Sequence, residues 1–167
     1  MNWHDLGKAL KEAVQQIEQH RTTGGHARLN HGQCASLGVM AERLPHNGLV
    51  LADEVGMGKT RIATQLIRSV VDAGGRVAVV LPGGLGFQWQ RELRGSGLTV
   101  DPVVRGILGF MHTFCDVSVE PWDRRNVVLL SHAFSNTRLQ KGSDARRWIL
   151  LPAIVAILRE SAGHDAA

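Results

Sequence analysis

Residues 56–60 of this chain, Gly-Met-Gly-Lys-Thr, have the types and the spacing needed to bind a triphosphate. Without Cβ atoms, Gly56 and Gly58 let the backbone approach an anion closely, and a helix that starts directly afterwards points unpaired N–H groups at it. Lys59 supplies a positive charge for the β- and γ-phosphates, and the Thr60 hydroxyl suits Mg²⁺. The stretch therefore predicts a site for ATP with Mg²⁺; the alternative is a flexible turn with a surface lysine.

The segments next to this loop carry the patterns of elements that would position it. An apolar run at 48–52 predicts a short buried strand before the loop. Apolar residues recur at helical spacing over 59–75 and predict an amphipathic helix after it, ended by Gly74 and Gly75. A strand, a glycine-rich loop and a helix in this order form the context that a phosphate-binding loop requires.

The rest of the chain alternates between helical and strand patterns. Asp5 is expected to cap the first helix. Alternating strands and helices imply βαβ units, so we expect an α/β fold with a parallel sheet covered by helices on both faces. The remaining helices are expected over 5–20, 32–48, part of 83–95 and 152–163, and the remaining strands over 76–82, 126–131 and, less clearly, 98–104.

Composition limits the classes of protein to consider. The 167 residues are 44% hydrophobic and 20% charged, which indicates one domain with a buried core. The formal net charge of +4 permits nucleic-acid contact without establishing it. Cys34 and Cys115 have no CxxC partner, and the eight histidines lack metal-ligand spacing. The chain shows no signal peptide and no apolar run of membrane-spanning length, so a cytoplasmic protein without a membrane partner is expected.

The loop departs from the common phosphate-loop consensus GxxxxGK[ST], because Asp53 occupies the position of its first glycine. This departure argues against a small nucleotide kinase. The stretch DEVGMGKT (53–60) resembles motif I of superfamily-2 helicases, and specifically of the Swi/Snf-type DNA translocases. The resemblance implies a RecA-like P-loop NTPase lobe with Lys59 as the catalytic residue and Thr60 on Mg²⁺. The implied ATP-binding residues of the loop are Asp53, Glu54, Val55, Gly56, Met57, Gly58, Lys59, Thr60 and Arg61.

Three further stretches resemble the same family in the same order. RLNHGQ (28–33) is similar to the segment that carries a glutamine upstream of motif I, which implies that Gln33 reads the adenine edge; otherwise Gln33 simply opens a helix. Residues 77–93 resemble motif Ia, which lies against the nucleic acid. Residues 124–136 resemble motif Ib, which places Ser131 near the nucleic-acid backbone.

Two arginines are candidates for contact with the same strand. Arg91 and Arg94 flank the end of the QWQREL segment and are our choices for phosphate contacts, the alternative being ordinary solvated charge. DNA is favoured over RNA because the resemblance is to DNA translocases.

The groups that hydrolysis requires are not evident. In the family an Asp-Glu pair at the end of a buried strand holds Mg²⁺ and orients water, but the one adjacent acidic pair here, Asp53–Glu54, lies in motif I, and Ser131–His132 follows the later strand. Motors of this family also have a second lobe, and this sequence has no room for one. We therefore expect residues 1–25 to form an N-terminal helix and linker and 26–167 an incomplete helicase ATP-binding domain, a fragment whose remaining lobes could lie on another chain. Whether it is an enzyme stays open.

Two classes of function follow. The first is the ATP-binding part of a helicase-like DNA translocase, with hydrolysis needing elements absent from this chain. The second is a non-catalytic module, derived from such a lobe, that binds nucleic acid or a partner protein. Loss of function in Lys59→Ala would favour the first, and tolerance of that change would favour the second.

Overall fold

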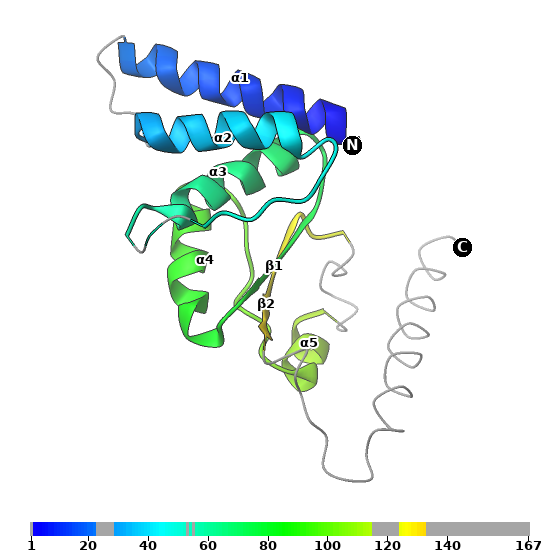
Figure 1. Ribbon diagram of the computed structural model, residues 1–167. Coiled ribbons are helices and arrows are strands. Elements are labelled where there is room, and N and C mark those ends of the chain that lie inside the picture. Colours follow the sequence, from blue (N-terminus) through cyan, green and yellow to red (C-terminus); the bar gives the residue numbers. More distant parts are fainter. Residues whose placement is uncertain (1, 23–28, 53, 55, 115–123, 133–167) are drawn as a thin grey trace. The chain divides into compact units, whose positions relative to one another are not determined.

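The computed structural model describes residues 2–22, 29–52, 54, 56–114 and 124–132, and it is a mixed α/β structure with a two-stranded parallel sheet (Figure 1). The chain divides into two compact units. The first comprises residues 1–77 and 88–100, and the second comprises residues 78–87 and 101–167. The elements in chain order are α1 (Trp3–Thr22), α2 (His31–Arg43), α3 (Lys59–Asp72), β1 (Val77–Leu81), the 3₁₀ helix η1 (Gly83–Leu85), α4 (Gly86–Gly95), α5 (Ile107–Phe114) and β2 (Val127–Ser131).

Helices α1, α2 and α3 pack together in the first unit, with α1 and α2 side by side and running in opposite directions (Figure 1). The start of α1 corrects one prediction. The residue that caps α1 is Asn2 rather than Asp5: Asn2 Oδ1 accepts from the Asp5 backbone N–H at 2.8 Å, and Asp5 Oδ2 accepts in return from the Asn2 N–H at 3.5 Å. Asn2 is well suited to this role because its short side chain reaches the third N–H group of the first turn.

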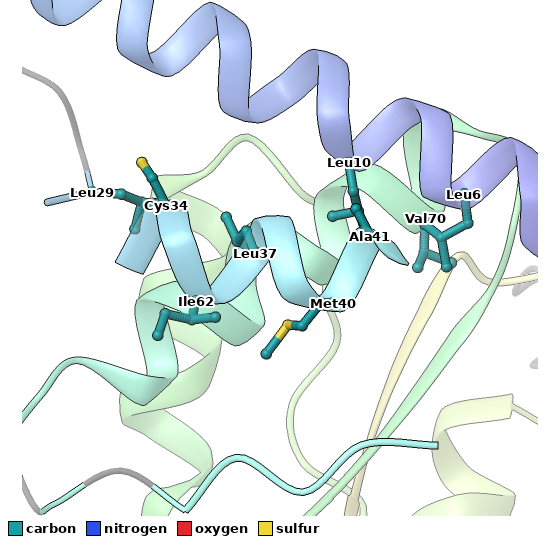
Figure 2. Packing of buried hydrophobic residues seen from close by; sticks show 9 residues of the cluster. All are labelled: Leu6, Leu10, Leu29, Cys34, Leu37, Met40, Ala41, Ile62 and Val70. Atoms are coloured by element: carbon teal, nitrogen blue, oxygen red, sulfur yellow. The ribbon is translucent and has the colours of Figure 1, made fainter. Parts of the chain in front are cut away.

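The core of the first unit is formed by apolar residues that recur at helical spacing on these three helices (Figure 2). Removal of such side chains from water is the main source of stability, at roughly 1.5–3 kcal/mol for each large aliphatic side chain. Gly7 allows the close approach of α1 to α2, because a Cβ there would lie 2.8 Å from the Ala41 carbonyl oxygen. The buried members are Leu6, Leu10, Leu29, Cys34, Leu37, Met40, Ala41, Ile62 and Val70.

The predicted end of α3 is confirmed. Gly74 has a left-handed φ of 75°. Its N–H donates to the Val71 carbonyl at 2.9 Å, and the Gly75 N–H donates to the Val70 carbonyl at 2.8 Å. This pair of bonds is a Schellman motif, which satisfies the last carbonyls of the helix.

The second unit contains the paired strands. The strands predicted over 76–82 and 126–131 are confirmed as β1 and β2. The segment 98–104 contributes only an isolated parallel bridge between Val104 and Leu130, in which the Val104 N–H donates to the Leu129 carbonyl at 2.9 Å. Val104 packs with Phe114 of α5 and Val128 of β2.

The prediction of a buried strand over 48–52 is wrong. These residues lie outside helix and strand, and Val50 is 92% exposed. A strand is stable only when a neighbouring strand pairs with its backbone groups, and the part of the chain that is described provides no such neighbour for this run. The helix expected over 152–163 lies outside the described residues.

No helix in the described ranges is long and apolar enough to cross a membrane.

Candidate functional site

The loop that leads into α3 has a conformation that only glycine adopts readily. Gly56 has φ 91° and Gly58 has φ 79°. Side chains with a Cβ are strained in this left-handed region, so the glycines have a backbone role here. Gly58 is the N-cap of α3, and Lys59 is its first residue.

The hydrogen bonds of α3 begin at Gly58. The Gly58 carbonyl accepts from the N–H groups of Arg61, at 2.9 Å, and Ile62, at 3.3 Å. The N–H groups of Lys59 and Thr60 precede these in the first turn of the helix. A helix start of this kind favours an anion through both its N–H groups and its dipole.

The Lys59 side chain lies back over the loop. Its Nζ donates to the Glu54 carbonyl at 2.7 Å, in an exposed position. Because this bond to a neutral carbonyl is open to solvent, breaking it costs little free energy, whereas a charge-assisted bond from the ammonium to a phosphate oxygen would be stronger.

Gln33 holds the loop from the neighbouring helix. Its Nε2 donates to the Met57 carbonyl at 3.0 Å, and its Oε1 accepts from the Asn30 N–H at 3.0 Å. The Asn30 side chain in turn accepts from the Gln33 N–H at 2.9 Å, which completes a capping box at the start of α2. Gln33 is buried, and both ends of its amide are engaged within the protein. This geometry assigns it the positioning of the loop.

The other predicted residues of the loop are open to solvent to different degrees. Glu54, Met57 and Arg61 are exposed, whereas Thr60 is half-buried at the first turn of α3. Asp53 and Val55 lie outside the described residues.

The three predicted nucleic-acid contacts fall in different surroundings. Arg91 and Arg94 are exposed on α4 in the first unit. Arg94 Nη2 donates to the Val100 carbonyl at 3.0 Å, and this bond connects α4 to the segment that follows it. Ser131 belongs to the second unit and is 2% exposed. The charges of Arg91 and Arg94 are therefore at the surface, whereas Ser131 is buried.

A polar pocket beside the loop was not predicted from the sequence. It has a volume of about 450 Å³ and lies between α3 and α4 in the first unit. Arg61, Thr64 and Gln65 stand at helical i, i+3 and i+4 positions, so they share one face of α3. That spacing is visible in the sequence, but spacing on one helix does not indicate that a second helix, α4, lies across from it. The lining residues are Leu29, Arg61, Thr64, Gln65, Arg91, Glu92, Gly95 and Ser96.

The donor set of the loop fits a phosphate chain better than it fits a protein-bound metal. Within the ranges described, no three His, Cys, Asp or Glu side chains gather to hold a metal ion. The Thr60 hydroxyl is the loop group suited to Mg²⁺ that a nucleotide brings with it.

Comparison of the chain with protein-family models, with curated proteins and with solved structures finds no match.

Proposed function

We propose that this chain binds Mg-ATP through residues 53–61, as the ATP-binding part of a helicase-like DNA translocase with a RecA-like lobe. The observation that carries the proposal is the loop itself: two left-handed glycines lead directly into the start of α3, with the Lys59 ammonium bonded to a carbonyl of the same loop. The order of the sequence motifs supports the helicase class.

The groups of the loop have distinct tasks in such a complex. The N–H groups at the start of α3 would hold the β- and γ-phosphate oxygens, since the start of a helix directs its N–H groups and the positive end of its dipole toward an anion. Lys59 would leave the Glu54 carbonyl and pair with the phosphates. The Thr60 hydroxyl would bind Mg²⁺, which neutralises phosphate charge when it is present. Gln33 keeps the Met57 carbonyl in place throughout.

Ligand-induced stabilisation tests this proposal. A ligand that binds only the folded state raises the free energy of unfolding by about 2.7 kcal/mol at a concentration 100 times its Kd. We expect Mg-ATP to raise the melting temperature of the wild-type chain measurably, and Mg-AMP, which lacks the β- and γ-phosphates, to raise it much less. Equal shifts with both nucleotides would contradict binding through the phosphate loop.

The alternative is a non-catalytic module that binds nucleic acid or a partner protein. Large apolar side chains that remain exposed favour it: Val50 is 92% exposed, Phe87 70% and Val80 62%. This function predicts that Lys59→Ala leaves binding to DNA or protein unchanged. Both functions allow contact between Arg91 and a DNA phosphate. If Arg91 makes that contact, Arg91→Gln should make DNA binding less dependent on salt concentration. Arg43→Gln is the control, because Arg43 is exposed at the end of α2.

A further inference from the structure

The polar pocket between α3 and α4 begins where the phosphate loop ends. Arg61, which lines it, directly follows Thr60, and Thr64 and Gln65 lie about one turn further along α3. The Arg68 guanidinium donates to the Ser96 carbonyl and holds the two helices together beside the pocket. A ligand bound to the loop by its phosphates would therefore have this pocket within reach of its other end.

Thr64 is an independent sign of a ligand. The residue is 7% exposed, and its Oγ1 has no hydrogen-bond partner among the residues that the structure describes. Buried hydroxyl groups without a partner are rare, because the lost hydration is not replaced. Thr64 also lines the pocket, so a polar ligand that enters far enough between α3 and α4 to reach the hydroxyl would supply the missing partner.

The lining indicates which kind of ligand this is. Arg61 and Arg91 bring planar guanidinium groups, which stack on flat rings, and Leu29 adds an apolar surface. Gln65 offers one donor group and one acceptor, and the Glu92 carboxylate accepts only. A simple anion would meet the negative charge of Glu92, whereas a nucleobase with ring N–H or amino groups would find a partner in it. The volume of about 450 Å³ lies in the range of small-molecule sites.

Gln33 holds the loop with part of its amide. One bond runs from its Nε2 to the Met57 carbonyl and one from the Asn30 N–H to its Oε1. We propose that the nucleoside of the bound nucleotide lies in the α3–α4 pocket, where Gln65 and Glu92 contact the edge of the base. This inference rests on the proposed binding of a nucleotide to the loop.

Calorimetric titration with two ligands separates the pocket from the loop. Mg-ATP carries a nucleoside, whereas Mg-tripolyphosphate presents only the phosphate chain. We expect Gln65→Ala and Glu92→Ala each to weaken Mg-ATP binding about fivefold or more, the equivalent of one hydrogen bond, and to leave tripolyphosphate binding unchanged. The matched controls Gln15→Ala and Glu12→Ala, both exposed on α1, should change neither.

The outcomes distinguish this inference from the function on which it rests. Unchanged Mg-ATP affinity in both pocket variants would overturn the pocket assignment, while loss of both ligands in Lys59→Ala would still support the loop. A wild-type chain that binds neither ligand would overturn both.

Thr64→Val provides a second measurement that does not depend on disruption of the fold. Removal of a buried hydroxyl without a partner should raise the melting temperature of the free chain. If the hydroxyl also meets the nucleoside, the same variant should bind Mg-ATP severalfold more weakly. A more stable variant with unchanged Mg-ATP affinity would count against the proposal.

Discussion

At the scale of single residues, Gly58 lies where the phosphate loop meets the side chain of Gln33. Its φ of 79° sets the end of the loop, and an added Cβ would lie 2.3 Å from Gln33 Nε2, the atom that holds the Met57 carbonyl. Both effects act against any larger residue, the first through backbone strain and the second through a steric clash with a buried amide.

Gly58→Ala should therefore lower the free energy of unfolding by about 1–2 kcal/mol, as a positive φ costs for residues with a Cβ, and should weaken Mg-ATP binding. Gly38→Ala is the matched control, because Gly38 lies within α2 and has no atom within 4 Å of an added Cβ. There the exchange should stabilise the chain by about 0.5–1 kcal/mol. Urea denaturation measures both, and equal effects of the two changes would contradict this account of the loop.

The backbone role of Gly56 and Gly58 can be predicted from the sequence, because a left-handed φ depends on the residue type itself. The sequence does not predict the partner of Gln33. That residue stands in a segment whose resemblance suggests contact with adenine, but the contacts of its amide depend on how α2 meets the loop 24 positions later. Contacts between distant segments of this kind cannot be derived from spacing along one helix.

At the scale of elements, α2 is the centre of the first unit. Leu37 is fully buried, with its neighbours from α1 and α3 on either side (Figure 2). Its replacement removes apolar contacts and leaves a cavity in a close-packed region, where the surrounding side chains relax only in part.

Leu37→Ala should lower the free energy of unfolding by about 2–5 kcal/mol. Val39→Ala, two residues along the same helix at a position that is 48% exposed, should change it much less. Denaturation followed by circular dichroism gives both values, and a small effect at Leu37 would mean that the three helices do not share one core.

Sequence patterns predict the helices better than the sheet. The apolar spacing in α1, α2 and α3 identifies each helix, and Gly74 and Gly75 identify the end of α3. The run at 48–52 has the composition of a buried strand, yet composition does not determine whether another strand pairs with it. The same limit applies to 98–104, where only Val104 forms a bridge.

At the scale of the whole molecule, the loop, Gln33 and the α3–α4 pocket all belong to one compact unit. Nucleotide binding can therefore be expected from that unit. The end of β2, with Ser131 and His132, belongs to the second unit. We assign nucleotide binding, and not hydrolysis, to the first unit.

Equilibrium binding of a fluorescent ATP analogue with Mg²⁺ tests the central claim most directly, on the wild type, Lys59→Ala and the control Lys11→Ala, whose side chain is exposed on α1. Loss of a charge-assisted contact worth about 1.5–3 kcal/mol should weaken binding at least tenfold in Lys59→Ala and leave Lys11→Ala unchanged. Saturable binding by the wild type that disappears in Lys59→Ala is the result that this account predicts. Equal binding by all three chains, or binding by none, would contradict it.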